Sequence, residues 1–257
     1  MYIEQPLIVA SDAATNDRFG TSLAIADERT LVVGAPGNNG KAYVFTRQSN
    51  GTWLETAILQ SSLLSTEFGL AVAVTKGGCR VYVSAPSAFG NGAVYVYKKT
   101  QNGYVRMQTL LPTILGVGVF FGVSVRVSPD GTVLAVGNFG AVDPTNVGVE
   151  VYVSNGCNYR QSAFINTNVN PLQFTDSMQL AQDGHILAIA NTDPNGTADQ
   201  VIFELWYSCD AKTWVRRQVE VQQGVDGRAR VIAINQKGDT IGVGSDNIIT
   251  PVNLYTR

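Results

Sequence analysis

Charged residues are scarce in this sequence, and histidine and cysteine are rarer still. The 257 residues include 18 Lys and Arg, 20 Asp and Glu, and one His, which gives a formal net charge of −2. Because no basic cluster is present to neutralise a phosphate backbone, we expect no nucleic-acid partner. Hydrophobic residues still make up 45% of the chain, which excludes a disordered polypeptide and suits a well-buried domain.

The sequence also lacks a long apolar run. Its longest apolar stretch, Ile114–Val125, is interrupted by glycines at positions 116, 118 and 122 and is shorter than a membrane span. Met1 is followed directly by Tyr2, Ile3 and Glu4, which do not resemble a signal peptide. We therefore expect no membrane span and no secretion signal within this chain.

The single histidine and the three cysteines limit the chemistry that the chain can perform. His185 falls in a tight hairpin, whereas Ser-His-Asp or Cys-His catalysis needs a base beside a nucleophile in a cleft. Cys79, Cys157 and Cys209 lie in three separate hairpins, and a disulfide requires Cα atoms within about 7 Å. We predict an exposed turn histidine and three free thiols, and the free thiols favour a reducing compartment or a particle assembled in one.

Short strands, in contrast, are abundant, and the stretch Phe19–Leu59 shows their pattern. Its runs of Val, Ile, Tyr and Phe fit a pleated, half-buried surface and have no helical period. Turn residues separate the runs at 27–29, 36–40 and 49–51. We predict four strands, at Thr21–Ala26, Thr30–Gly34, Lys41–Thr46 and Thr52–Leu59.

This four-strand unit repeats along the whole chain, at spacings of 49, 53, 53 and 54 residues. The unit starts near Phe19-Gly20, Phe68-Gly69, Phe121-Gly122, Phe174-Thr175 and Arg228-Ala229. The third strand recurs with an aromatic residue at the same register each time, in Tyr43-Val44-Phe45, Tyr95-Val96-Tyr97, Glu150-Val151-Tyr152, Glu204-Leu205-Trp206 and Asn253-Leu254-Tyr255. One domain of such repeats uses all of residues 1–257.

The fifth unit stops after its third strand, at Arg257, and a matching fourth strand stands at the other end of the chain. Residues Tyr2–Val9 align with the strand that begins at Trp53, aromatic for aromatic. We therefore predict an all-β, five-bladed β-propeller of four-stranded antiparallel blades, whose ring is closed by the N-terminal strand as the outer strand of the last blade.

The repeated motifs resemble the FG-GAP repeat, the blade type of the integrin α-subunit propeller. The resemblance rests on the Phe-Gly pairs and on Gly34-Ala35-Pro36 and Ser84-Ala85-Pro86, and it fades in the last two blades. It implies a protein or glycan ligand, adhesion-type binding, and a soluble, cell-surface or virion-associated location. Five blades here differ from the seven of integrins.

Integrin-type blades often carry calcium between their first two strands, but these connections are short hairpins here. Each has at most two carboxylates, and a hard cation needs six to eight oxygen ligands. We predict no metal and no cofactor, with the pair Asp193 and Asp199 as the only alternative metal site.

The longer loops should gather on one face of the propeller, which we call the long-loop face. Loops held by a rigid scaffold are the usual place for binding residues, although Asn, Asp and Gly also serve turns. The candidate ligand-binding residues are Asn38, Asn39, Phe89, Asn91, Asn138, Phe139, Asp143, Asn146, Asp193, Asn195, Asp199, Asp246 and Asn247. Two Asn-x-Thr sequons, at Asn50 and Asn195, also fall in predicted loops and fit either glycosylation or plain turns.

A carboxylate-based enzyme is the competing prediction, because glycosidases need two carboxylates flanking the scissile bond. The carboxylates near the starts of the inner strands are Asp17, Glu67, Asp176 and Asp226, and they do not share one repeat register. Arg126 and Arg230 fit either an anion site in the channel or pairing with a neighbouring acid. Arg126 should face away from Val125 and Val127.

We thus expect a non-enzymatic interaction module that binds a protein or glycan through the long-loop face, with no catalytic residues. The alternatives are a structural subunit of a larger assembly, such as a virion or cell-surface component, and a glycosidase-like propeller.

Overall fold

The computed structural model describes residues 6–63, 66–116, 118–140, 147–167, 178–192, 200–223, 229–235, 237–245 and 253–256. Within these residues the chain is built from β-strands, with only two short 3₁₀ turns, Lys76–Gly78 and Ala88–Gly90. No helix in the described ranges is long and apolar enough to cross a membrane.

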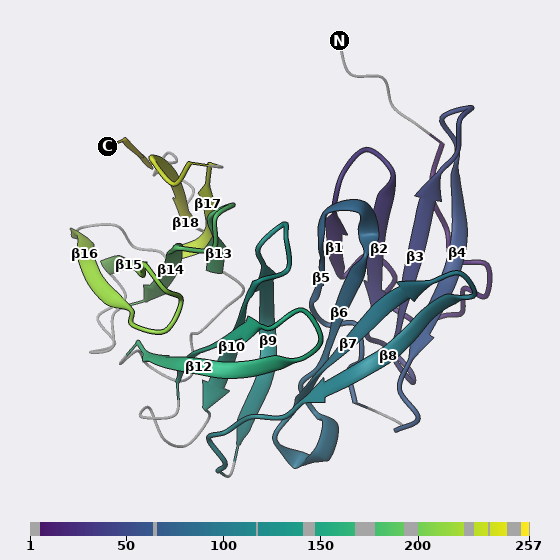
Figure 1. The fold of residues 1–257 in the computed structure, drawn as a ribbon, viewed down its shortest axis with the longest axis horizontal. Coiled ribbons are helices and arrows are strands. Elements are labelled where there is room, and N and C mark those ends of the chain that lie inside the picture. The colour runs from purple at the N-terminus through teal and green to yellow at the C-terminus, as the bar shows by residue number, and fades with distance from the viewer. Residues whose placement is uncertain are drawn as a thin grey trace.

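The strands form five antiparallel sheets that follow one another in chain order (Figure 1). The first sheet contains β1 (Ser22–Ile25), β2 (Thr30–Ala35), β3 (Lys41–Arg47) and β4 (Trp53–Gln60). The second contains β5 (Val72–Val74), β6 (Arg80–Ala85), β7 (Ala93–Thr100) and β8 (Gly103–Leu110), and the third β9 (Val119–Val127), β10 (Val133–Gly140), β11 (Gly148–Ser154) and β12 (Tyr159–Asn166). The fourth contains β13 (Met178–Leu180), β14 (Ile186–Thr192), β15 (Gln200–Tyr207) and β16 (Val215–Gln223), and the fifth β17 (Ala229–Ile234), β18 (Thr240–Ser245) and β19 (Asn253–Thr256).

The repeat predicted from the sequence is confirmed at this level. Each of the first four sheets is a four-stranded meander, and the fifth has the three strands expected of a truncated unit. The bounds of the strands in blade one agree with the prediction to within one residue. We refer to the sheets as blades one to five.

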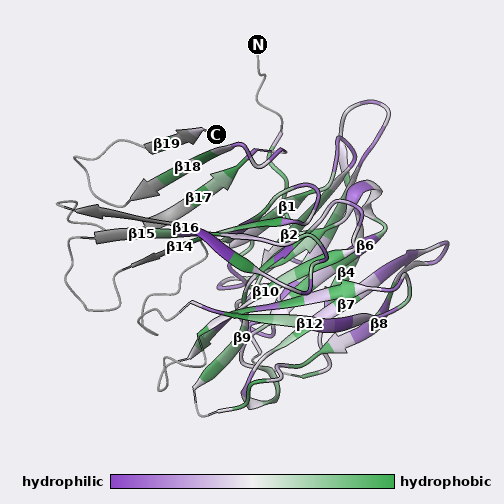
Figure 2. Cartoon of the chain, turned by 60° about the vertical axis from the view of Figure 1, so that its left-hand side comes forward, coloured by the Kyte–Doolittle hydropathy of each residue, from purple (hydrophilic) through white to green (hydrophobic). Residues whose placement is uncertain are grey.

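Burial explains the composition of the strands. The middle strand β2 is buried at every position, because Val32 packs against blade two and Leu31 and Val33 pack with Ile8 and Ala10 of the N-terminal segment. The outer strand β4 alternates between half-buried and exposed positions for most of its length, as expected for a strand with one face in water. Figure 2 shows the hydrophobic colour concentrated on the inner and middle strands, and the hydrophilic colour at outer hairpins such as β7–β8.

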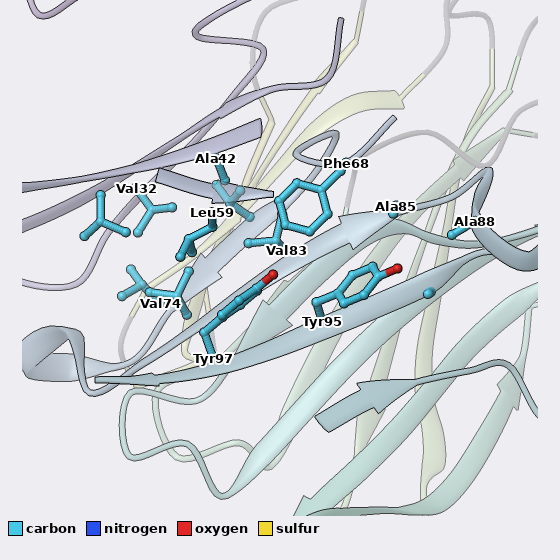
Figure 3. Packing of buried hydrophobic residues seen from close by; sticks show 14 residues of the cluster. Val32, Ala42, Leu59, Phe68, Val74, Val83, Ala85, Ala88, Tyr95 and Tyr97 are labelled. Carbon is cyan, nitrogen blue, oxygen red and sulfur yellow. The ribbon is translucent and has the colours of Figure 1, made fainter. Parts of the chain in front are cut away.

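Apolar clusters fill the spaces between successive blades. In the cluster between blades one and two, Val32 and Val44 pack with Val83 and Tyr95 (Figure 3). Similar clusters join blade two to three, three to four and four to five. Each blade is therefore stabilised by burying apolar surface against the next blade.

The Phe-Gly pair has a clear structural role. Phe68 is fully buried, and its ring lies 5.3 Å from Tyr95 and 6.5 Å from Tyr97 in the third strand of its own blade. Phe19 packs in the same way on Tyr43 and Phe45. The repeated phenylalanine therefore packs on the repeated aromatic residues in the third strand of its own blade.

The predicted closure of the ring is not seen among the described residues. The inner strands contact one another in order, from β1 to β5, β9, β13 and β17. Pro6–Ala10 forms no strand, and Met1–Gln5 lies outside the described residues. The outward face of β1 is open, since Leu23 is 64% exposed and Ile25 68%, whereas Val72 in β5 is 4% exposed.

Candidate functional site

A group of exposed apolar side chains lies on the long-loop face of blades two and three. Phe89 is 60% exposed, Leu111 50% and Leu115 70%. These residues come from the loop between β6 and β7 and from the connection between β8 and β9. We group them with the half-buried pair Phe120 and Phe139, which lies at the long-loop ends of β9 and β10, and call these five residues the aromatic surface.

Phe89 occupies a backbone conformation that a bulky side chain rarely adopts. Its φ is +53°, in the left-handed region that favours glycine. The neighbouring Ala88 is fully buried, and its carbonyl oxygen accepts a hydrogen bond of 2.7 Å from the Gly92 amide. Gly92 in turn lies so close to Phe121 that a Cβ would stand 2.3 Å from the Phe121 oxygen. The surrounding structure therefore holds the Phe89 ring outward at a cost in backbone strain.

Asn91 joins the segments that carry the aromatic surface. Its side-chain oxygen accepts a hydrogen bond of 3.2 Å from the Gly116 amide, in the connection that carries Leu115. Its backbone oxygen accepts a hydrogen bond of 2.9 Å from the Phe121 amide, at the start of blade three. Asn91 thus fixes the position of Phe89 relative to Leu115, even though only part of its own side chain is exposed.

The rings of Phe120 and Phe139 pack together at the ends of β9 and β10, with centroids 5.8 Å apart and planes inclined by 38°. Both side chains are half-buried, and Phe139 also packs against the cluster between blades three and four. Paired aromatic groups of this kind give a rigid apolar contact area.

Ser87 lies two residues before Phe89, and its hydrogen bond to Glu67 brings a carboxylate to the same loop. The Ser87 hydroxyl donates a hydrogen bond of 2.7 Å to Glu67 Oε2, and Ser87 is exposed. The backbone of Glu67 also lies in the left-handed region, with φ +55°. Arg18, at the corresponding position of blade one, has the same conformation, with φ +57°. The aromatic surface therefore has a carboxylate and a hydroxyl at one edge, which could orient a polar ligand.

The buried carboxylate of Glu150 holds segments near the aromatic surface in place through hydrogen bonds. Glu150 is fully buried and accepts hydrogen bonds from the Asn138 side-chain amide at 2.9 Å, the Tyr152 hydroxyl at 2.7 Å and the Thr113 amide at 3.1 Å. Burial, and then the charge of Glu150, raise the pKa of Tyr152, so this phenol stays protonated and donates. The Thr113 bond holds the connection that carries Leu111 and Leu115 against blade three.

The structure brings together only some of the candidate residues proposed from the sequence. Phe89, Asn91 and Phe139 belong to the aromatic surface. Asn138 lies inside β10 and is fully buried, so its amide serves Glu150 and is not open to a ligand. The remaining candidates Asp143, Asn146, Asp193, Asn195, Asp199, Asp246 and Asn247 lie outside the described residues.

The two candidates in blade one lie in a separate loop, where Asn38 and Asn39 are exposed. The Asn38 amide donates to Asp17 Oδ1 at 2.6 Å and to the Thr15 carbonyl at 3.0 Å. The hydrogen bond from Asn38 holds the pKa of Asp17 below its usual value. Asn38, whose φ is +49°, therefore ties its loop to the segment at Thr15 and Asp17 that precedes blade one.

No pair of candidate catalytic carboxylates emerges from the described residues, since Asp17 is bound within blade one and Glu67 by Ser87 of blade two. Asp176, Asp226 and Arg230 lie outside these residues or have undescribed side chains. Arg126 pairs with Ala135 in register and so faces blade four, away from Val125 and Val127, as predicted.

The single histidine and the three cysteines differ in their exposure. His185 was predicted to be exposed, but it is half-buried. It directly precedes β14, which packs within blade four. The three cysteines are free and exposed. Over the described ranges, no group of three or more His, Cys, Asp and Glu side chains is arranged to hold a metal ion.

Sequence reasoning missed Leu111, Leu115 and Phe120. Leu115 and Phe120 lie in the glycine-interrupted run that begins at Ile114, which was used only to exclude a membrane span, and Leu111 precedes that run. The glycines themselves were the signal, because a run broken at 116 and 118 cannot continue as one strand.

Comparison with known proteins supports the fold. The FG-GAP repeat family model matches residues 2–45, which confirms the resemblance to this repeat in the stretch from the N-terminal segment to β3. No curated protein sequence matches the chain significantly.

Solved structures with the same fold are β-propellers and include enzymes. The chain resembles the periplasmic gluconolactonase of Pseudomonas aeruginosa with a TM-score of 0.65 at 18% identity, covering 98% of this chain and 71% of that one. It resembles the β-propeller domain of Swd1 from Myceliophteria thermophila with a TM-score of 0.60 at 12% identity, covering 92% and 69%. A putative 6-phosphogluconolactonase from Bacteroides uniformis gives 0.53 at 11% identity, covering 93% and 81%.

These neighbours correct one expectation. The sequence led us to predict that the chain is not an enzyme, and that prediction is contradicted by the two neighbours described as lactonases. The prediction relied on the absence of a histidine-based or paired-carboxylate set. A propeller scaffold places reactive groups on loops from several blades, so motif spacing along the chain does not reveal them.

Proposed function

We propose that the chain recognises a glycan through the aromatic surface on its long-loop face, with a protein ligand on the same surface as the alternative. The observation that carries this proposal is Phe89, a bulky residue held left-handed and exposed. Strain of this kind persists where the surrounding structure enforces it, and it is concentrated at functional sites. An exposed ring of fixed orientation offers a flat face for a sugar ring or an apolar anchor.

The neighbouring groups suit this role. Leu111, Leu115 and the pair Phe120 and Phe139 extend the apolar area, and Glu67 and Ser87 add hydrogen-bonding groups at its edge. Binding sites typically combine an apolar lining with a few polar groups that set orientation. The long-loop connections are held by Asn91 and Glu150, so little ordering is needed on binding.

The test replaces Phe89 by Gly and measures binding of glycans to the purified chain. Glycine accepts the left-handed backbone, so the variant should fold and lose only the ring. The matched control is Leu54→Ala, which removes an exposed apolar side chain, 55% exposed, from the outer strand β4. We expect at least a tenfold loss for F89G and no loss for L54A, and equal binding by both variants would contradict the proposal.

We further propose that the five blades close into a ring, with the N-terminal segment completing blade five. Ile8 aligns with Leu59, Leu110 and Ile165, the apolar residues near the ends of the outer strands. Each of those three is buried in the cluster formed with the following blade. Ile8 packs in the same way onto the cluster of blade one, against residues such as Leu31 and Phe45.

Lactone hydrolysis is a second candidate function, because one structural neighbour is described as a gluconolactonase and another as a putative 6-phosphogluconolactonase. The test follows acid release from glucono-1,5-lactone, with heat-denatured protein as the control for spontaneous hydrolysis. A rate that is proportional to the amount of native protein would support this function, and a rate equal to the control would exclude it for this substrate.

A further inference from the structure

A pocket of about 350 Å³ opens on the face opposite the aromatic surface, at the end of the propeller axis. Every blade contributes to it at the end of its inner strand, through residues that include Ala26, Val127, Leu180 and Ile234. This is the face of the short hairpins between first and second strands. The pocket therefore collects equivalent positions of five repeats around one axis.

Part of the lining of this axial pocket, which we call its collar, is apolar and partly exposed, beside the polar residues Gln182 and Asn235. Ala26, Val127, Leu180 and Ile234 are each half-buried, so their side chains present uncovered apolar surface to the pocket. A volume near 350 Å³ falls at the lower end of the range for small-ligand sites. An alkyl chain of a few carbons would cover this collar and bury its apolar area.

Lys76 is the one charged residue among those that line the axial pocket. It is exposed, and its ammonium group forms no salt bridge within the described part of the chain. Its backbone is fixed, because the Lys76 amide donates a hydrogen bond of 2.9 Å to the Pro129 carbonyl of the next blade. Gln182 adds an exposed side-chain amide to the same rim.

Four of the five acidic residues of these hairpins, Asp27, Asp130, Asp183 and Asp239, accept hydrogen bonds near their turns, and the fifth, Glu28, is exposed. Asp27 accepts hydrogen bonds from the amides of Arg29 at 2.8 Å and Gly77 at 2.9 Å. Asp130 accepts from Ser128 and Thr132, and Asp239 from Asn235. None of these carboxylates is among the lining residues, where Lys76 is the one charged side chain.

We propose that the axial pocket binds a small amphipathic monocarboxylate, with its alkyl chain against the apolar collar and its carboxylate at Lys76 and Gln182. Both halves of the ligand follow from the lining, since the collar selects an apolar chain and the lone cation selects an anionic head. The site is independent of the aromatic surface and of the function proposed for it.

The experiment measures binding of hexanoate by ligand-observed NMR titration to the whole chain, beside acetate and hexan-1-ol as probes. We expect saturable hexanoate binding in the range of about 1 mM, with acetate and hexan-1-ol each several-fold weaker. Lys76→Gln should weaken hexanoate binding by about fivefold, the upper end for an exposed ion pair. Lys98→Gln, at an exposed position of β7, is the matched control and should change nothing.

A second variant tests the collar, because Leu180→Asn should remove the preference for hexanoate over acetate while the unfolding temperature confirms a folded chain. The proposal is overturned if hexanoate shows no saturable binding, or if K76Q and K98Q bind it equally. It is also overturned if hexan-1-ol binds as tightly as hexanoate, which would mean that the pocket recognises only the alkyl chain.

Discussion

The carbonyl oxygen of Gly69 lies 2.0 Å from the position that a Cβ atom on Gly34 would occupy. Gly69 belongs to the Phe-Gly pair of blade two, and Gly34 to the Gly-Ala-Pro segment of blade one. The two halves of the repeated motif therefore meet across the interface between blades. The same Gly69 oxygen accepts a hydrogen bond of 2.8 Å from the Ser22 hydroxyl, which fixes it in place.

Replacing Gly34 by Ala should lower the free energy of unfolding by about 2–3 kcal/mol, because the new methyl group overlaps fixed backbone. The φ of Gly34 is not left-handed, so this cost reports the contact alone. Gly90→Ala is the control, since Gly90 has φ +80° and open space around its Cβ position. Its cost should be only about 1 kcal/mol, from backbone strain. Denaturant unfolding of both variants checks the difference, and equal costs would refute the close contact.

Replacing Ile8 by Asn should destabilise the chain by about 2 kcal/mol or more, because a polar group would be buried against blade one. The neighbours Leu7 and Val9 are 90% and 69% exposed, so Leu7→Asn is the matched control and should have little effect. Thermal unfolding measures both. If the two variants melt together, the N-terminal segment does not pack as the outer strands of the other blades do.

Stability should fall at alkaline pH because of buried phenols. Burial raises the pKa of Tyr97 and of Tyr104 to about 12, above the ordinary value of 10. The folded chain then holds these protons more tightly than the unfolded chain does. Their contribution is complete below about pH 10 and is lost as the pH rises through about 12. Unfolding free energies between pH 9 and pH 12, in about half-unit steps, should fall less steeply for Y97F/Y104F than for the unchanged chain.

Acid should remove a different stabilising contribution. Burial opposes ionisation of Asp130, but hydrogen bonds from Ser128 and Thr132 outweigh it and hold the pKa of Asp130 below its ordinary 3.8. A lowered carboxyl pKa stabilises the fold above that ordinary value, and the gain is lost as the pH falls through the folded pKa. Asp130→Asn should therefore be less sensitive to pH below 4 than Glu28→Gln, an exposed control. Parallel pH profiles would contradict this assignment.

How much the sequence could predict differs between the scaffold and the site. Strand positions in blade one followed from alternating apolar residues and turn residues, because these are local properties. The register of Tyr43, Tyr95 and Glu150 followed from repetition. Nothing local indicated that Glu150 would be fully buried, since its partners Thr113 and Asn138 come from other strands and connections.

The candidate residues show the same limit. Phe89 and Asn91 were found because they stand in a loop whose ends the repeat defines. The repeat predicted that the second strand of blade three ends near Asn138, but β10 continues to Gly140. Asn138 therefore lies within the strand, and its side chain is fully buried. The exposure of Leu115 depends on the path of the connection between β8 and β9. That path is fixed by the hydrogen bond from the Gly116 amide to Asn91, a residue distant in the sequence.

The most direct test of the proposed function is a glycan array probed with the unchanged chain, F89G and L54A, each with and without EDTA. The account predicts a defined set of bound glycans, binding that EDTA leaves unchanged, retention by L54A and a loss of at least tenfold in F89G. F89G should also gain about 0.5–1 kcal/mol of stability, because glycine relieves the left-handed strain. Glycan binding that F89G retains, or an array with no bound glycan, would contradict the account.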